Sequence, residues 1–189
     1  MKSLEEKIIN EGEILPGNIL KVDSFLNHQI DAKFLDEIGK DFFEHFKDKN
    51  INKIVTIEAS GIAIAMACAR YFECDIVFAK KGKSANMHGD LYEAVVDSYT
   101  YKKPYKVTLS KKYLSKEDNV LIVDDFSAQG NAMKGLISIC EMAGASVSGV
   151  GIVIEKGFQN GGEYLRNANV PLYSQAIIDG YQDGKIIFR

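Results

Sequence analysis

Two adjacent carboxylates, Asp124 and Asp125, follow an apolar run and precede a loop of small residues in the string VLIVDDFSAQGNAMKG, residues 120–135. The pattern predicts a buried strand with the acidic pair at its carboxyl end, then a turn and a helix. Vicinal ribose hydroxyls would suit this pair, because each hydroxyl can donate a charge-assisted hydrogen bond to a carboxylate. A solvated polar turn is the alternative for an isolated pair of aspartates. The complete string favours a ribose site.

The loop after the acidic pair has the composition of a phosphate site. Ala128, Gly130 and Ala132 leave the backbone open to a ligand, and Ser127 and Asn131 can add hydrogen bonds. The start of the following helix supplies unpaired N–H groups and a partial positive charge. Ligands of open α/β sheets bind at the carboxyl ends of the strands. A phosphate at the loop and a ribose at the acidic pair would together bind a ribose 5-phosphate.

Two further segments could bind an anion. EASG, residues 58–61, joins an expected strand to an expected helix, where small side chains and a helix N-terminus suit an anion and a plain tight turn is the alternative. Residues 80–112 carry eight lysines and three acidic residues, a local net charge of +5 in a chain of net charge −3. This excess could neutralise a departing pyrophosphate, or it could form a solvated face.

The elements that position these residues follow an α/β pattern. Apolar strands without polar alternation are expected at residues 53–58, 75–79, 119–125 and 146–156, with helices at residues 61–72 and 131–143. Such strands, separated by helices, favour a mostly parallel central sheet flanked by helices on both faces. Residues 93–101 and 104–110 predict an antiparallel hairpin, and we expect residues 80–112 to form a mobile lid and hairpin.

The two ends of the chain are expected to pack together. Ser3 and Glu6 have the spacing of a capping box, and Asp31 is expected to begin a longer helix. The first 50 residues and the C-terminal residues 173–189 would then form a small hood subdomain over one end of the sheet. Because the chain has no internal repeat and no linker, residues 1–189 predict a single domain.

Composition and charge exclude several classes of protein. The net charge of −3 argues against broad nucleic-acid binding, and no apolar stretch has the length of a membrane span or a secretory signal. The cysteines (Cys68, Cys74 and Cys140) are odd in number and lack ligand spacing, and the three histidines are scattered. We therefore expect a cytoplasmic protein with reduced thiols, no metal site built from protein ligands, and no nucleic-acid or membrane partner.

The string at residues 120–135 resembles the phosphoribosyl-pyrophosphate signature of the type I phosphoribosyltransferases. The resemblance implies that Asp124 and Asp125 hold the ribose hydroxyls. It also implies that the 5-phosphate is held by the loop Ala128, Gln129, Gly130, Asn131 and Ala132. Many members of the family carry a threonine where this chain has Asn131 and Ala132. Backbone N–H groups would therefore provide more of the phosphate binding here.

The same resemblance has implications for the rest of the site. It places a pyrophosphate loop at residues 58–61, including Ser60, and favours Lys81, Ser84 and Ala85 as the functional residues of the lid. It implies Mg²⁺, bound mainly through the pyrophosphate and ribose oxygens of the substrate, because this ion keeps several waters and needs few protein ligands. It also implies a homodimer.

Two flanking segments, residues 11–31 and 154–162, resemble the branch of the family that uses xanthine. They imply that Leu20, Asn27 and Lys156 contact the base. An amide donor at Asn27 could favour the C2 carbonyl of xanthine, and a cation at Lys156 would suit a base that is partly anionic near neutral pH. In the absence of the resemblance, Asn27 could cap a turn, Leu20 would belong to the core, and Lys156 would be solvated.

We therefore expect a purine salvage transferase that makes xanthosine 5′-monophosphate and pyrophosphate from xanthine and 5-phosphoribosyl 1-pyrophosphate. A purine nitrogen would displace pyrophosphate at C1 of the ribose through an oxocarbenium-like state, so the protein would mainly position reactants and stabilise charge. The alternatives are the same reaction on hypoxanthine, guanine or adenine, a phosphoribosyl-pyrophosphate-binding regulator of transcription, and a non-catalytic nucleotide-binding subunit.

Overall fold

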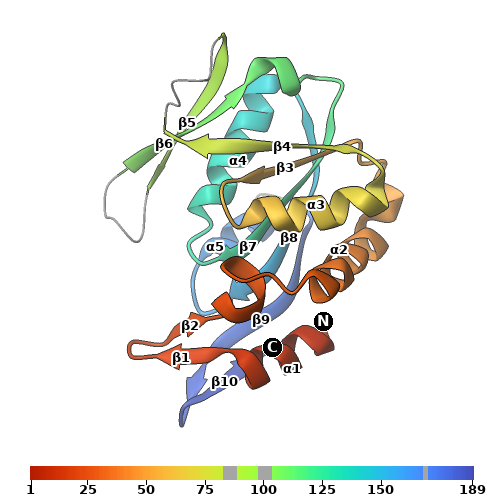
Figure 1. Cartoon of the computed structure of the whole chain (residues 1–189). Coiled ribbons are helices and arrows are strands. Elements are labelled where there is room, and N and C mark those ends of the chain that lie inside the picture. Colours follow the sequence, from red (N-terminus) through yellow and green to blue (C-terminus); the bar gives the residue numbers. More distant parts are fainter. Residues whose placement is uncertain (83–88, 98–103, 168–169) are drawn as a thin grey trace.

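The computed structural model describes residues 1–82, 89–97, 104–167 and 170–189, and within them eight strands form one large sheet in the order β10-β9-β8-β7-β3-β4-β6-β5 (Figure 1). The central strands run parallel: β3 (Lys53–Ile57), β4 (Asp75–Lys81), β7 (Asn119–Ser127), β8 (Ser146–Lys156) and β9 (Leu172–Gln182). The remaining three, β5 (Leu91–Asp97), β6 (Pro104–Ser110) and β10 (Lys185–Phe188), pair antiparallel at the two edges. The expected mostly parallel sheet is confirmed.

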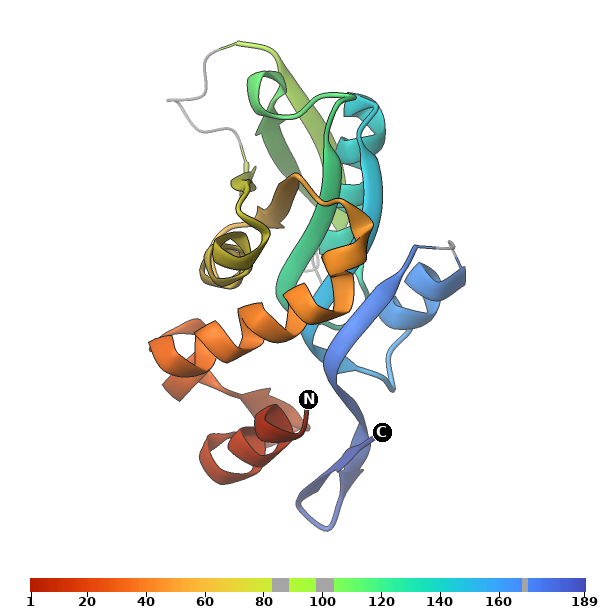
Figure 2. The same ribbon diagram turned by 90° about the vertical axis from the view of Figure 1, so that its right-hand side faces the viewer.

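Helices cover both faces of this sheet. One face carries α2 (Ala32–Phe46) and α3 (Gly61–Phe72), and the other carries α4 (Asn131–Ala143) and α5 (Gly161–Asn167), as Figure 2 shows. Strand β7 serves both layers: Leu121 and Val123 are buried against one set of helices, while Val120 and Ile122 are buried against the other. A strand that alternates between two cores must be apolar throughout, which explains the continuous apolar run in the sequence.

Helix α2 begins as the sequence predicts. Asp31 is its N-cap, and one carboxylate oxygen accepts hydrogen bonds from the backbone N–H groups of Lys33 (3.2 Å) and Phe34 (3.1 Å). These bonds satisfy two of the donors that a helix N-terminus leaves unpaired. Lys7 links this helix start to α1 (Lys2–Glu11), because its ammonium group pairs with Asp31 (2.9 Å) and with Glu11 (2.8 Å).

The expected capping box at Ser3 and Glu6 is wrong. Helix α1 (Lys2–Glu11) has Met1 as its N-cap and no side-chain cap. The carbonyl of Met1 accepts hydrogen bonds from the backbone N–H groups of Leu4 and Glu5, both at 3.2 Å, so Ser3 already lies inside the first turn. The Met1 amino group donates to the carbonyl of Gln175 in β9.

The N-terminal segment and the end of the C-terminal segment lie together at one end of the sheet (Figure 1). The predicted C-terminal part of the hood differs in the structure, because most of residues 173–189 belong to the strands β9 and β10 of the large sheet itself. The N-terminal part of this hood contains α1, the strands β1 (Glu13–Leu15) and β2 (Ile19–Lys21), and a π-helical turn, Asp23–Asn27. Its buried residues, such as Leu4, Ile8 and Phe25, share a single apolar cluster with Ile178 of β9. The hood is therefore packed onto the sheet through a continuous core.

The predicted hairpin is present as the antiparallel strands β5 and β6, and it extends the sheet. Its first strand begins at Leu91 rather than at residue 93, and residues 98–101 of the predicted strand lie outside the described residues. Strand β6 pairs with β4 through Lys80–Thr108 and Lys81–Val107. Strand β5 packs on α4 so closely that a Cβ at Gly135 would meet a methyl group of Val96. Residues 83–88 and 98–103, which include Ser84, Ala85 and three of the expected lid lysines, lie outside the described residues. A mobile lid therefore stays a prediction.

The two short 3₁₀ helices of the described chain, Lys47–Lys49 and Lys111–Tyr113, connect longer elements. The described helices include none with both the length and the apolar character that crossing a membrane requires.

Candidate active site

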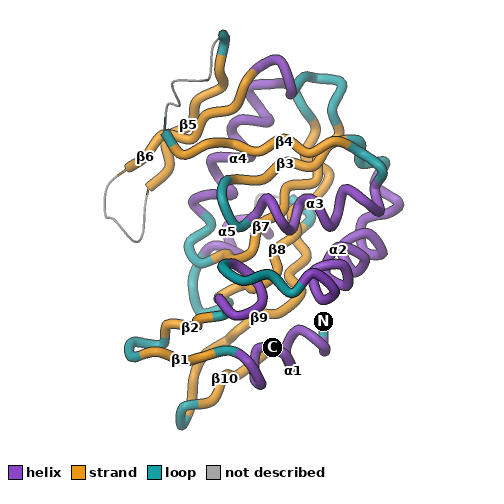
Figure 3. Tube along the Cα trace, in the orientation of Figure 1, coloured by secondary structure: helices purple, strands orange, loops and turns teal. Residues whose placement is uncertain are grey.

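The loops that follow β3 and β7 meet at the carboxyl edge of the parallel strands (Figure 3). Strand β3 is followed by α3 and then by β4 on one side, whereas β7 is followed by α4 and then by β8 on the other side. The direction of winding thus reverses between β3 and β7, and ligands of open α/β sheets bind outside such a switch point. Residues 58–61 and 124–132 both lie there.

The acidic pair is buried. Strand β7 continues to Ser127, so Asp124 and Asp125 lie within it and are only 6% and 7% exposed. The backbone N–H of Asp125 donates to Asp124 Oδ1 at 3.0 Å. Burial, and then the negative charge of Asp125, raise the pKa of Asp124 well above its usual range. The solvated-turn alternative is therefore wrong: two desolvated carboxylates lie side by side at the edge where a ligand would bind.

Helix α3 starts directly against Asp124. A Cβ at Gly61 would meet the hydroxyl of Thr56 and would lie 3.0 Å from Asp124 Oδ1, so only glycine fits at this position. The Thr56 hydroxyl is itself buried and donates to the carbonyl of Val123 at 2.7 Å. These contacts fix the loop after β3 to the end of β7. Sequence reasoning missed Thr56, because its neighbours in the strand, Val55 and Ile57, are apolar and do not mark it as part of a site. It included Gly61 as the last residue of the loop 58–61, but not its contact with Asp124.

The expected pyrophosphate loop is tied to β4. Ser60 is the N-cap of α3 and its side chain makes no capping bond. The carboxylate of Glu58 accepts a hydrogen bond from the backbone N–H of Lys81 at 2.6 Å. The positive charge of Lys81 acts on Asp124 and opposes the rise of its pKa. Ser60, Lys81 and the acidic pair, which are far apart in the sequence, therefore belong to one neighbourhood.

The expected phosphate loop has the geometry that its composition suggests. Gly130 is the N-cap of α4 and has φ +70°, a conformation that favours glycine. Beside it, Asn131 Nδ2 donates to Gln129 Oε1 at 3.5 Å, while Ala128 and Ala132 are half-buried. The hydroxyl of Ser127 is buried and has no hydrogen-bond partner among the described residues. A buried polar group of this kind is suited to a ligand.

The hood contacts the acidic pair through Asn27. Its amide Nδ2 donates to Asp125 Oδ2 at 3.0 Å, across 98 positions of sequence. The side chain of Asn27 therefore does not serve merely to cap a turn. The Asp125 contact uses one N–H and leaves the second N–H and the carbonyl of the amide for a ligand.

The other two expected base contacts differ in burial. Leu20 is 6% exposed and belongs to the apolar cluster of the hood, as its residue type alone suggests. Lys156, at the end of β8, is half-buried rather than solvated, and burial lowers its pKa. It has no ion-pair or hydrogen-bond partner for its ammonium group in the part of the chain that the structure describes. A desolvated cation is suited to an anionic or strongly polar ligand.

Two more polar side-chain atoms, one in the turn after Lys156 and one in β9, are buried without a hydrogen-bond partner among the described residues. The backbone N–H of Gln159 donates to the carbonyl of Lys156 at 2.9 Å, so the two residues form one turn. Gln159 Oε1 and the hydroxyl of Tyr181 are buried without a partner among the described residues, and the Tyr181 ring packs edge-on against Phe158 at 6.0 Å. Sequence reasoning did not select these three residues, although two of them lie in the segment 154–162.

The acidic pair also fits a weakly held divalent cation. No group of three or more His, Cys, Asp or Glu side chains in the described residues could hold a metal by itself. Mg²⁺ typically binds through one or two carboxylates plus substrate oxygens and waters. Asp124 and Asp125 are two buried, adjacent carboxylates, which fits an ion held partly by the protein and partly by the substrate.

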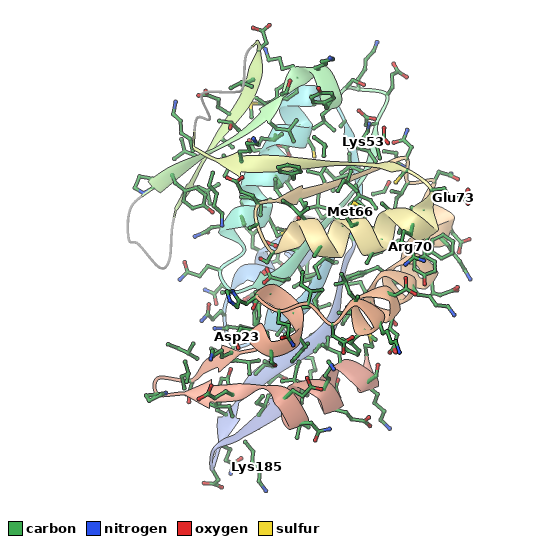
Figure 4. The ribbon with its side chains drawn as sticks, viewed as in Figure 1. Asp23, Lys53, Met66, Arg70, Glu73 and Lys185 are labelled. Carbon is green, nitrogen blue, oxygen red and sulfur yellow. The ribbon has the colours of Figure 1, made fainter. Side chains whose placement is uncertain are left out.

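A cavity of about 660 Å³ lies at the opposite end of the strands. It is lined by residues around the starts of β3 and β4, including Arg70, Glu73 and Asp75. Figure 4 labels Lys53, Arg70 and Glu73 at this end, whereas Asp23, in the turn that leads to Asn27, lies toward the other end. The cavity is thus separate from the acidic pair and the two loops.

Comparison with known proteins agrees with this geometry. The model of the phosphoribosyl transferase domain matches residues 21–166. A xanthine phosphoribosyltransferase 1 of Clostridium perfringens is 53% identical over 190 residues, and a xanthine phosphoribosyltransferase of Finegoldia magna is 51% identical over 189; both alignments cover 100% of each chain. Adenine phosphoribosyltransferase of Rhodothermus marinus shares the fold, with a TM-score of 0.76 at 21% identity over 94% of this chain and 100% of that one. The chain belongs to the phosphoribosyltransferase family.

Proposed function

We propose that the protein is a purine salvage transferase that makes xanthosine 5′-monophosphate and pyrophosphate from xanthine and 5-phosphoribosyl 1-pyrophosphate. The observation that carries the proposal is the buried pair Asp124 and Asp125. This pair lies between Gly61, the first residue of α3, and Asn27 of the hood. Relatives about half identical over their full length bear the name xanthine phosphoribosyltransferase.

The phosphoribosyl group would bind along the end of β7. Residues 128–132 would hold the 5-phosphate through the backbone N–H groups at the start of α4, supported by the partial positive charge of the helix. The unpartnered hydroxyl of Ser127 would add one hydrogen bond. Asp124 and Asp125 would accept hydrogen bonds from the ribose hydroxyls, which would compensate the desolvation of both carboxylates.

The base would bind between the hood and the end of β8. Lys156 would provide positive charge for the acidic base, and the free groups of the Asn27 amide would contact its edge. Leu20 would add apolar contact from β2. We propose that residues 1–50 mainly form this base-binding hood and that residues 80–112, apart from their share of the sheet, act as a lid.

The reaction is a displacement at C1 of the ribose, in which a purine nitrogen forms the new bond as the bond to pyrophosphate breaks. The negative charge of Asp124 and Asp125 lies close to the ribose, where it stabilises the developing oxocarbenium character. Ser60 and Lys81 hold the pyrophosphate end of the substrate. Mg²⁺, when bound, neutralises the charge that collects on the pyrophosphate oxygens.

We also propose that the protein is a cytoplasmic homodimer, which the resemblance to the type I family supports. Sedimentation should then give a species of about 42 kDa, twice the 21.0 kDa of the chain. A species of one chain mass at working concentration would contradict the dimer.

Incubation with xanthine, 5-phosphoribosyl 1-pyrophosphate and Mg²⁺ tests the proposed reaction. Chromatography should show xanthosine 5′-monophosphate and pyrophosphate in equal amounts, with no product when any one component is left out or when the ion is removed with a chelator. Folded protein that forms no nucleotide would contradict the proposal.

A further inference from the structure

An ion pair with one buried partner, Glu155, and one partly exposed partner, Arg166, lies close to the phosphate loop. The side chain of Glu155, in β8, is 2% exposed, and its two carboxylate oxygens accept hydrogen bonds from the two terminal nitrogens of Arg166, both at 2.9 Å. The hydroxyl of Ser174, in β9, donates to Glu155 Oε2 at 2.5 Å. The Arg166 side chain reaches this carboxylate from α5 while remaining 42% exposed. The bidentate pair therefore anchors α5 to two central strands.

Helix α5 in turn contacts the phosphate loop. The backbone N–H of Gly161 donates to the carbonyl of Ala128 at 3.1 Å. A Cβ at Gly161 would lie 2.5 Å from the backbone N of Gly130 and 2.6 Å from the Ala128 carbonyl oxygen. The start of α5 is thus pressed against the backbone of the loop, with no room for a side chain between them.

The next glycine contacts the ion pair instead. A Cβ at Gly162 would meet Glu155 Oε1 and would lie 2.6 Å from an Arg166 nitrogen. Gly161 touches the loop and Gly162 touches the ion pair, so two consecutive residues connect them. A second contact holds α5 near the start of α4: the Lys134 ammonium group lies 4.4 Å from the centre of the Tyr164 ring.

We infer that Arg166 and Glu155 are positioning residues for the 5-phosphate: they hold α5 so that Gly161 supports the backbone of residues 128–132 in its phosphate-binding conformation. The inference rests on the proposed function, because it takes residues 128–132 as the phosphate loop. The support is important in this chain, because residues 128–132 would hold the phosphate through the backbone N–H groups at the start of α4. If α5 shifts, the loop loses its hydrogen bond and its support, while Leu20 and Asn27, the base contacts on the hood, stay in place.

Four variants test the inference at different points of the chain of contacts. Arg166→Met removes the bidentate donor, and Arg166→Lys keeps the charge with a single donor group. Gly162→Ala wedges the ion pair apart without touching the loop, and Ser174→Ala removes only one of the bonds to Glu155. Arg70→Met is the matched control for the arginine, because it breaks an ion pair with Asp36 (2.6 Å) at the opposite end of the strands. Gly180→Ala is the control for the glycine, since a Cβ there meets nothing within 4 Å.

The readouts are the KM values for both substrates and the affinity for ribose 5-phosphate, measured by calorimetry. We expect Arg166→Met and Gly162→Ala to raise the KM for 5-phosphoribosyl 1-pyrophosphate and the Kd for ribose 5-phosphate by about tenfold or more, since small displacements of positioning groups have effects of this size. Arg166→Lys and Ser174→Ala should give smaller changes in the same direction. In the four variants, the KM for xanthine should stay within about twofold of its value in the unchanged protein. In the two control variants, both KM values and the Kd for ribose 5-phosphate should stay within the same range.

Equal changes in both KM values, or unchanged values in all four variants, would overturn the inference. Ser174→Ala and Arg166→Lys remove the least, so they keep the test decisive if Arg166→Met does not fold. Failure of the proposed function has a different signature: the unchanged protein would then make no nucleotide. Ribose 5-phosphate binding by the same variants would still test the support of the loop.

Discussion

At the scale of single residues, the site is organised around two carboxylates that are buried where a ligand is expected. Asp125 is held by the hood through Asn27, and Asp124 lies against the glycine that starts α3. Neither aspartate has a cationic partner in direct contact among the described residues. Burying two unpaired carboxylates costs desolvation free energy, which hydrogen bonds from substrate hydroxyls and a bound cation would offset.

The first prediction concerns Asp125→Asn. The amide keeps the shape of the side chain and can still accept the hydrogen bond from Asn27, so the melting temperature should change little. It removes a negative charge beside the developing cation, and kcat/KM should fall by about 10²-fold or more. Initial rates and thermal unfolding, measured on the same preparation, check both parts. An unchanged kcat/KM would remove Asp125 from the mechanism.

The second prediction concerns Asp124 and pH. Because its pKa in the folded protein is raised above the ordinary 3.8, the folded state binds more protons than the unfolded state between pH 3.8 and the raised pKa. The contribution of Asp124 to stability is therefore present below pH 3.8 and is lost as pH rises through this window. Asp124→Asn stays neutral, so the variant should be more stable than the unchanged protein at neutral pH but much less active.

Thermal unfolding of both proteins across the acidic and neutral range checks this sign. The difference in melting temperature should grow as pH rises, at about 2–4 °C per kcal/mol for a domain of this size. Parallel curves would contradict the assignment of a raised pKa to Asp124.

The residue types of the site could be predicted from the sequence, but most of their contacts could not. The acidic pair and the loop of small residues are contiguous in the sequence, so their order along the chain is enough to predict a ribose site followed by a phosphate site. The bond between Asn27 and Asp125 spans 98 positions, and the ion pair of Glu155 and Arg166 joins a strand to a helix that follows it. Contacts of this kind depend on tertiary packing, which no local pattern encodes.

At the scale of elements, the helices that follow β3 and β7 begin and end where the local sequence pattern predicts. Helix α3 spans Gly61–Phe72 and α4 spans Asn131–Ala143, as predicted, because glycine or small polar residues mark each start and the apolar periodicity marks each length. Helix α1 differed, since the carbonyl of Met1 accepts the first helical hydrogen bonds and leaves Ser3 inside the helix. The hairpin was predicted, but its pairing with β4 depends on sheet topology.

A third prediction tests the packing of α2 on α3. A Cβ at Gly39 would lie 2.5 Å from the backbone carbon and 2.6 Å from the carbonyl oxygen of Ala67, so Gly39→Ala must push the two helices apart. We expect a loss of about 1–3 kcal/mol in the free energy of unfolding, since the gain in helix propensity is smaller than the strain. The KM values should not change.

Denaturant unfolding of Gly39→Ala beside Gly180→Ala measures this effect, because the second glycine has open space around it. A variant at Gly39 as stable as the control would show that the helices accommodate the methyl group.

At the scale of the whole molecule, the groups expected to bind the phosphoribosyl part of the substrate and those expected to bind the base come from different parts of the fold. The loops after β3 and β7 meet at the switch point of the sheet and suit a phosphorylated sugar, whereas the hood and the end of β8 supply the groups expected to contact the base. The parallel sheet could be predicted from apolar strands alternating with helices. The packing of the chain ends over one end of the sheet could also be expected, but the hydrogen bond from the hood residue Asn27 to Asp125 could not, because it joins residues 98 positions apart.

The central claim is that this chain transfers a phosphoribosyl group to xanthine in preference to other purines, and a comparison of four bases tests it most directly. Initial rates with xanthine, guanine, hypoxanthine and adenine, at equal 5-phosphoribosyl 1-pyrophosphate and Mg²⁺, give kcat/KM for each base. We predict that kcat/KM for xanthine exceeds kcat/KM for each of the other three bases by about tenfold or more. The reason is that a site built to pair with a polar group of the substrate rejects analogues that lack this group. A higher kcat/KM for any other base would leave the fold and the phosphate loop intact but would contradict the roles of Asn27 and Lys156.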